Sequence, residues 1–145
     1  MATITKELWG KSKEGKEIYL YTLTNESGAC IKVSSVGAGL VAACVPDRKG
    51  NLADVVLGYP EAASYFADGP CAGKVPGRYA NRIAKGKFEL DGKVYELPVN
   101  NGPNHLHGGP EGFQNQVWES RIENGGVEFL YDAADGEMGY PGALK

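Results

Sequence analysis

Two short segments bring together side chains whose polar groups match the hydroxyls of a sugar. In the first, Arg78, Asn81 and Arg82 lie within a stretch of five residues. An arginine presents five N–H donors in a fixed fork, and an asparagine offers donors and an acceptor, so both suit a ligand rich in hydroxyl groups. Alone, such a segment is more often a solvated strand end, because polar residues are mostly exposed.

The second segment holds the only two histidines of the chain, His105 and His107, on either side of Leu106. Residues two apart on a strand point to one face, so both rings could hold a metal ion together. No third cluster of ligands stands out in the sequence, whereas a structural zinc site needs four ligands. We therefore expect no metal, and interpret a histidine in this glycine- and asparagine-rich stretch as a hydrogen-bonded structural residue.

The stretch from Gly37 to Ala42 fits the dinucleotide-binding pattern G-x-G-x-x-A. That pattern has physical content only where a helix follows and points its N-terminus at a pyrophosphate. Residues 41–45 are instead β-like, and Pro46 ends them. The stretch is predicted to be a tight bend between two strands.

The elements that position these residues are predicted to be strands, because apolar and polar residues alternate with a period of two. We expect strands at residues 17–23, 29–33, 40–45 and 54–57, a helical turn or two at 61–66, and hairpins at 87–97 and 117–131. The turns Asp91-Gly92 and Asn124-Gly125-Gly126 mark the two hairpins, since a type I′ turn needs positive φ at both central residues. Short strands with polar turns indicate an all-β antiparallel sandwich or barrel.

Composition excludes several classes of protein. A net charge of −3 argues against nucleic-acid binding, which needs a basic face. Three widely spaced cysteines form no disulfide framework or CxxC pair, so we expect them to be reduced. The first residues show no signal-peptide pattern, and no apolar run approaches the roughly 20 residues of a membrane helix. We expect a cytoplasmic protein with no membrane partner.

Taken together and in order, the motifs closely resemble the galactose mutarotase (aldose 1-epimerase) family. The matching segments are residues 45–50, 54–58, 77–88, 90–92, 95–97, Asn100, 106–109, 112–113, Trp118 and 139–142. The resemblance implies an antiparallel β-sandwich of the galactose mutarotase-like type, with residues 1–145 a single domain that is roughly its first half. It also implies interconversion of the α and β anomers of aldohexoses, galactose and glucose especially, with no metal or redox cofactor.

The same resemblance assigns roles to residues. Asn81 and Arg82 match the family's substrate-binding asparagine and arginine, and His107 matches a histidine that contacts the sugar. No catalytic residue is identified, because the family's general acid, a second histidine, and its base, a glutamate, come from segments beyond this chain's end. A replacement pair of His107 with Glu96 or Glu111 is an alternative that needs a new geometry for both groups.

The last residues are turn-forming, and only three residues follow Gly142, so the sequence looks interrupted and an exposed sheet edge is expected. Three functions stay open. The chain is a truncated aldose 1-epimerase that lacks its acid and base, a non-catalytic carbohydrate-binding module, or one half of a split or oligomeric enzyme. In the last case, self-association or a complementing C-terminal half closes the edge.

Overall fold

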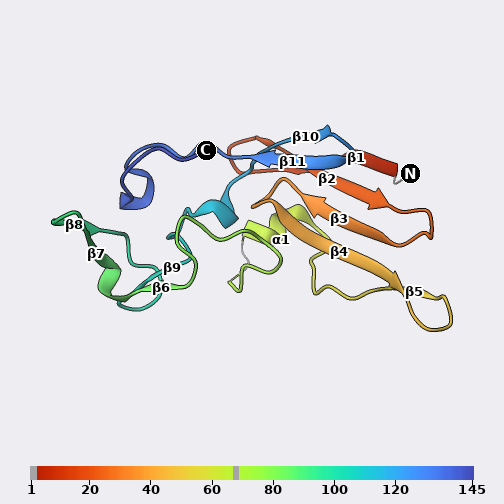
Figure 1. The fold of residues 1–145 in the computed structure, drawn as a ribbon, viewed down its shortest axis with the longest axis horizontal. Helices are drawn as coiled ribbons and strands as arrows, with labels where there is room; N and C mark the ends of the chain where they lie inside the picture. Colours follow the sequence, from red (N-terminus) through yellow and green to blue (C-terminus); the bar gives the residue numbers. More distant parts are fainter. Residues whose placement is uncertain (1–2, 67–68) are drawn as a thin grey trace.

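The computed structural model describes residues 3–66 and 69–145. Its main sheet is antiparallel, with its strands in sequence order (Figure 1). These strands are β1 (Thr3–Lys11), β2 (Glu17–Thr24), β3 (Cys30–Ser34), β4 (Gly39–Pro46) and β5 (Leu52–Asp54). The strands expected at 17–23, 29–33 and 40–45 are thus confirmed to within one residue.

The strand expected at residues 54–57 is wrong. Strand β5 ends at Asp54, whose carboxylate accepts hydrogen bonds from the backbone N–H groups of Ala43 at 2.8 Å and Val56 at 3.0 Å. The side chain thus takes N–H groups that a longer strand would place in the ladder, as aspartate does in turns. Val55 and Leu57 are 68% and 94% exposed, so their apolar character does not report a buried strand.

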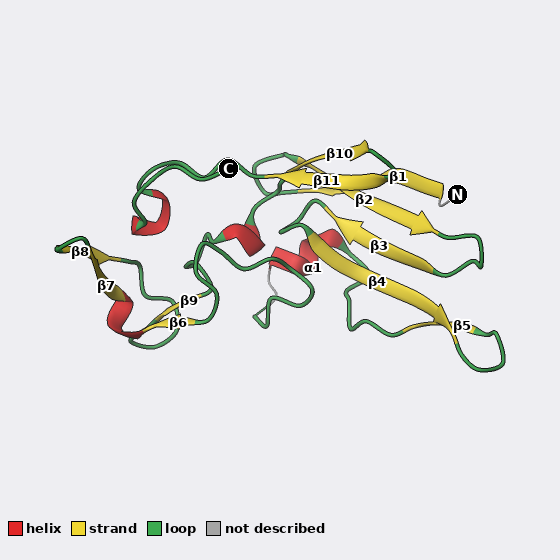
Figure 2. Ribbon diagram, in the orientation of Figure 1, coloured by secondary structure: helices red, strands yellow, loops and turns green. Residues whose placement is uncertain are grey.

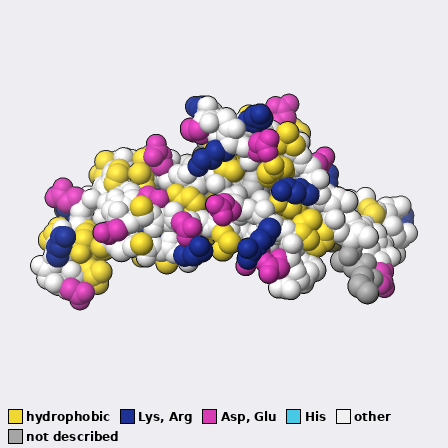
Figure 3. Space-filling model, turned by 90° about the horizontal axis from the view of Figure 1, so that it is seen from above, with side chains coloured by type: hydrophobic (Ala, Val, Ile, Leu, Met, Phe, Trp, Pro, Cys, Tyr) yellow, Lys and Arg dark blue, Asp and Glu magenta, His cyan; other side chains and the backbone are white. Residues whose placement is uncertain are grey.

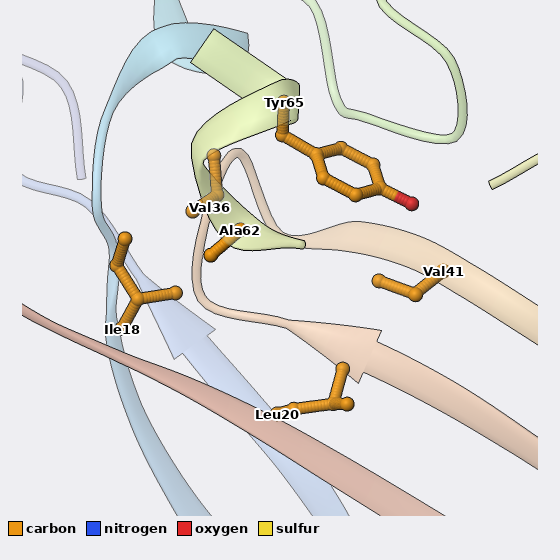
Figure 4. Packing of buried hydrophobic residues seen from close by; sticks show 6 residues of the cluster. All are labelled: Ile18, Leu20, Val36, Val41, Ala62 and Tyr65. Carbon is orange, nitrogen blue, oxygen red and sulfur yellow. The ribbon is translucent and has the colours of Figure 1, made fainter. Parts of the chain in front are cut away.

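One face of the main sheet carries the core. The short helix α1 (Ala62–Phe66) forms at the predicted place, and its Ala62 and Tyr65 pack with apolar side chains of β2 and β4 (Figure 4). The buried residues of this cluster are Ile18, Leu20, Val36, Val41, Ala62 and Tyr65. Alternation along β2 puts Ile18 and Leu20 on this face.

The opposite face of β2 is covered by a hairpin, β10 (Glu119–Glu123) with β11 (Gly126–Leu130), which lies over β1 and β2 (Figure 2). The fully buried Tyr21 donates its hydroxyl hydrogen to Ser120 at 2.9 Å and meets the ring of Phe129 edge-on, with centroids 6.0 Å apart. The sheet thus has a second β layer on it, and the expected all-β fold class is confirmed.

Both hairpins form around the predicted turns. Strands β7 (Lys87–Leu90) and β8 (Lys93–Glu96) are joined by Asp91 and Gly92, with φ of 54° and 75°. Asn124 and Gly125, with φ of 51° and 74°, join β10 to β11. Positive φ at both central residues is the type I′ requirement from which the hairpins were predicted.

The bend at Gly37 is confirmed as a link between strands. It has a φ of 58°, and a side-chain carbon there would come within 2.6 Å of the Gln114 carbonyl oxygen. The remaining strands are β6 (Arg82–Ile83) and β9 (His105–Leu106), and 3-10 turns lie at Ala84–Gly86, Phe113–Asn115 and Glu137–Gly139. Among the described residues, no helix has the length and apolar character to cross a bilayer.

Candidate functional site

The site residues meet where β6 pairs with β9, apart from the main sheet (Figure 1). Arg82 lies opposite Leu106 in this antiparallel ladder, and Ile83 lies opposite His105. The ladder therefore brings Asn81, just before β6, beside His107, just after β9. Two segments that are 26 residues apart in sequence thus form one site.

Two hydrogen bonds join Asn81 to His107. The N–H of His107 donates to the Asn81 carbonyl oxygen at 2.9 Å, and the N–H of Asn81 donates to Nδ1 of the His107 ring at 3.0 Å. Because Nδ1 accepts a hydrogen bond, the neutral ring carries its proton on Nε2. Among residues 3–66 and 69–145, no group hydrogen-bonds to this Nε2, so its N–H is available to a ligand hydroxyl.

The backbone at both residues is left-handed, with φ of 66° at Asn81 and 52° at His107. Such values are uncommon outside glycine, although asparagine and histidine adopt them more often than other residues. Residues in this conformation cluster at ligand sites, where the surrounding structure holds them. At His107 the conformation also ends the β alternation that would have placed its ring on the same face as that of His105.

Two amide oxygens orient the guanidinium of Arg82. Its Nε donates to Asn101 Oδ1 at 2.9 Å, and its Nη1 donates to Asn81 Oδ1 at 3.2 Å. An arginine has five N–H donors, so this arrangement leaves several for a ligand. Arg82 and Asn81 are exposed, and His107 is half-buried.

A pocket of about 530 Å³ opens beside these residues. Arg82 forms part of its wall, whereas Asn81 and His107 do not. The wall combines cationic, aromatic and aliphatic side chains: Arg78, Tyr79, Arg82, Ile83, Phe88, Leu90, Tyr140 and Pro141. On the face shown in Figure 3, positive and negative side chains are interspersed, so the surface there shows no field of one sign.

Asn100 extends the β9 edge. Its side-chain amide donates to the Leu106 carbonyl oxygen at 3.0 Å and accepts from the Leu106 N–H at 2.7 Å, in the manner of a neighbouring strand. These two bonds satisfy the backbone between the two histidines.

His105 is a structural residue, as the sequence indicated for a histidine in this stretch. Its side chain is fully buried. Nδ1 lies 2.6 Å from the Pro98 carbonyl oxygen, and Nε2 lies 2.8 Å from the Tyr140 hydroxyl. Both ring nitrogens have hydrogen-bond partners, so this ring has no free lone pair to give to a metal. Among the described residues, no cluster of three or more His, Cys, Asp or Glu has an arrangement that could hold a metal ion.

Arg78 has a role that the sequence did not indicate. Its guanidinium holds the backbone of a segment that is distant in sequence. Nη2 donates to the carbonyl oxygens of Ala134 at 2.7 Å and Ala133 at 3.2 Å, and Nη1 donates to those of Pro141, at 3.2 Å, and Gly142. Four backbone carbonyl oxygens thus accept hydrogen bonds from the guanidinium of Arg78, which is not one of the three residues expected to bind the sugar.

The segment before β6 and the segment after β9 touch so closely that only glycine fits at Gly108. A side-chain carbon there would lie 1.5 Å from the Gly77 carbonyl oxygen. Gly108 also has a φ of 84°, which other residues rarely adopt. In Leu106-His107-Gly108-Gly109, the first glycine is thus required by contact with the segment that carries Arg78 and Asn81.

Neither carboxylate considered as a partner for His107 hydrogen-bonds to it within the described part of the chain. Glu96 instead pairs with Lys87 across the β7–β8 hairpin, with Oε1 and Nζ 2.6 Å apart. Glu111 is exposed, and its carbonyl oxygen accepts a bond from Gln116. The replacement acid–base pair stays without structural support.

Comparisons with known proteins agree with these motifs. The model of the aldose 1-epimerase family matches residues 19–145. Galactose mutarotase from Sus scrofa is 43% identical over all 145 residues, and aldose 1-epimerase from Escherichia coli (strain K12) is 36% identical over 132 residues, or 90% of the chain. The chain spans only 42% and 38% of the lengths of these two relatives.

Solved structures show the same fold. The structure of galactose 1-epimerase from Lactobacillus acidophilus NCFM superposes with a TM-score of 0.80 at 25% identity, over 99% of this chain and 42% of that one. That of an aldose epimerase homologue from C. elegans gives 0.77 at 30% identity, over 99% of this chain and 39% of that one. The expected mutarotase-like sandwich is thereby confirmed for the matched part.

Proposed function

Since this chain belongs to the aldose 1-epimerase family, we propose that it binds an aldohexose, galactose or glucose, through Asn81, Arg82 and His107. The observation that carries the proposal is the hydrogen-bonded arrangement of these side chains. Asn81 fixes the ring of His107 with its proton on Nε2, and amide oxygens fix the fork of Arg82. Groups oriented before the ligand arrives lose less entropy on binding.

The family resemblance implies a proton-transfer reaction. A general base takes the proton from the C1 hydroxyl, and a general acid protonates the ring oxygen. The ring then opens, the C1–C2 bond rotates, and closure gives the other anomer. Such catalysis contributes about 10²–10⁴-fold, and only when both groups are within reach. We assign His107 to binding, because no carboxylate among the described residues hydrogen-bonds to it.

We therefore propose that the 145-residue chain binds the sugar and that fast anomerisation requires polypeptide corresponding to the remaining length of the relatives. A complementing C-terminal half would supply the acid and base, and a second copy of the chain is the alternative partner. The binding-module function is the same proposal without any partner. We also propose that residues 1–145 form one domain, and that it is cytoplasmic, which agrees with three cysteines that are in no disulfide.

Titration with α-D-galactose, followed by NMR, tests the binding proposal. We expect shifts at Asn81, Arg82 and the Cε1–H of His107. The variant Arg82→Ala should weaken binding about tenfold or more, because a hydrogen bond to a charged group contributes about 1.5–3 kcal/mol. His107→Ala should weaken it by up to about tenfold, because a hydrogen bond between neutral groups contributes about 0.5–1.5 kcal/mol. Arg121→Ala is the matched control, since Arg121 pairs with Glu123 and Glu128 on the β10–β11 hairpin. Unchanged spectra at saturating galactose would refute the proposal.

Polarimetry on freshly dissolved α-D-galactose separates the alternatives. No rate above buffer for the chain alone, and a rate on adding the C-terminal part of a relative, would support the split enzyme. No rate in either case, with binding retained, would support the binding module. A rate for the chain alone that His107→Ala abolishes would overturn the assignment of His107 to binding only.

A further inference from the structure

Two of the three cysteines face each other across neighbouring strands. Cys30 begins β3 and is the register partner of Cys44 in β4 (Figure 1 shows the two strands side by side). Residues directly opposite in an antiparallel pair project to the same face of the sheet. Both cysteines are half-buried and line one surface pocket of about 230 Å³, so a small reagent can reach them.

The flanking hydrogen bonds define which kind of pair this is. The Asn25 N–H donates to the Ala29 carbonyl oxygen at 2.9 Å, so the next residue, Cys30, turns its backbone groups away from β2 and toward β4. The Val55 N–H donates to the Ala43 carbonyl oxygen at 3.0 Å, so Cys44 turns its own groups toward β3. The two cysteines therefore form a hydrogen-bonded pair, for which the Cα atoms are about 5.5 Å apart.

That separation lies inside the range of roughly 4.4–6.8 Å found for disulfides. The Cβ atoms of opposed residues are about 4.5–5.5 Å apart, whereas a disulfide holds them at about 3.8 Å. The strands must thus draw together slightly, which makes such a bond easier to reduce than a relaxed structural one.

We propose that Cys30 and Cys44 form a reversible redox pair, which a small disulfide of the glutathione type converts into an intramolecular cystine across β3 and β4. In the first step, one cysteine thiolate attacks the small disulfide, forms a mixed disulfide and releases one small thiol. The second protein thiolate then attacks the protein sulfur of that mixed disulfide and releases the other small thiol. The protein loses two electrons, the small disulfide gains them, and the two thiol protons end on the released thiols.

The surroundings of the pair set its pH dependence. A hydrogen bond with the Cys30 thiol is the main cause that raises the pKa of Cys44, and the carboxylate of Asp54 on β5 adds to it. Lys32 on β3 acts in the opposite direction. Because the thiolate is the attacking species, cystine formation should accelerate with pH, by about tenfold per unit while the thiols remain mostly protonated.

Peptide mapping tests the proposal directly. Trypsin cleaves after Lys16, Lys32 and Arg48, so Cys30 and Cys44 fall in separate peptides, residues 17–32 and 33–48. After treatment of the folded chain with oxidised glutathione, we expect these two peptides to be joined, and the chain to lose about 2 Da as two thiols become one cystine. Excess dithiothreitol should separate them again.

Three variants make the test specific. Cys71→Ser should leave the linkage unchanged, because Cys71 lies in a different tryptic peptide and outside the β3–β4 ladder. Cys30→Ser and Cys44→Ser should each stop at a mixed disulfide that retains one glutathione. A linkage that involves Cys71, or two separate mixed disulfides on Cys30 and Cys44 of the wild-type chain, would overturn the proposal. The wild-type map decides the question even if a serine variant does not fold.

Discussion

The hydrogen bond between Tyr140 and His105 gives the most direct test of how the proposed sugar site is built. The Pro98 carbonyl oxygen only accepts, so the Nδ1 of His105 must carry a proton, and in the neutral ring Nε2 accepts from the Tyr140 hydroxyl at 2.8 Å. Tyr140 is 7% exposed and His105 is fully buried. The substitution Tyr140→Phe removes the donor but leaves the aromatic ring, so it creates no large cavity.

The expected loss follows from the burial of the acceptor. A buried nitrogen left without its donor costs the desolvation penalty of that group, about 1–3 kcal/mol of the free energy of unfolding. Tyr19→Phe is the matched control, because the Tyr19 hydroxyl donates to the exposed carboxylate of Glu17, which water can solvate again. A surface change of this kind is usually within about 0.5 kcal/mol of neutral.

Urea unfolding at pH 7 measures both variants, and ¹⁵N NMR of the wild-type chain reports which ring nitrogen of His105 carries the proton. If Tyr140→Phe cost no more than Tyr19→Phe, or if the proton were found on Nε2 alone, the reasoning would be refuted. Because His105 lies only two residues before His107, the result also bears on how His107 is held. A fixed ring at His105 anchors the backbone that presents the ring of His107, which we propose binds the sugar.

Three further predictions concern backbone contacts and pH. Gly108→Ala should cost at least about 3 kcal/mol, since its new carbon would overlap the Gly77 carbonyl oxygen, whereas Gly136→Ala, with a similar φ but open space, should cost about 1–2 kcal/mol in urea unfolding. Burial raises the pKa of Tyr140 from its ordinary value of 10.0 to about 12, so its neutral form stabilises the fold below pH 10. The free energy of unfolding should therefore fall between pH 10 and about 12, and fall less in Tyr140→Phe. Hydrogen bonds from backbone N–H groups, that of Ala43 foremost, hold the pKa of Asp54 below its ordinary value of 3.8. The ionised carboxylate therefore stabilises the fold above pH 3.8, and this stabilisation is lost as the pH falls through the lower pKa of the folded state. Acid unfolding of Asp54→Asn should accordingly depend less on pH than that of the wild type.

Much of the main sheet was readable from the sequence, because each strand carries its own alternation and each hairpin its own turn residues. Strand β1 was not predicted, since as an edge strand it exposes most of its residues and so lacks a clear apolar face. The strand at 54–57 was wrongly predicted for the opposite reason, an apolar run that is not a strand. Its apolar residues look like a buried run, but the Asp54 carboxylate bonds the backbone and ends the strand.

The site itself has little local signal. Strands β6 and β9 are two residues long, too short for any periodicity, and their pairing joins distant segments. The family resemblance identified Asn81, Arg82 and His107, but it could not predict the hydrogen bonds among them. The hydrogen bonds of Arg78 could not be predicted from the sequence, because its four acceptors are backbone carbonyl oxygens, and every residue has one.

Residues 133–142 adjoin the proposed sugar site, because Tyr140 and Pro141 share a pocket wall with Arg82. Arg78, three residues before Asn81, hydrogen-bonds to this stretch at Ala134. His105, two residues before His107, hydrogen-bonds to it at Tyr140. If a sugar bound at Asn81 and His107 stabilises these two contacts, then by linkage the ordered contacts favour sugar binding by the same free energy. The proposed sugar affinity and the stability of residues 133–142 are therefore linked by one coupling free energy.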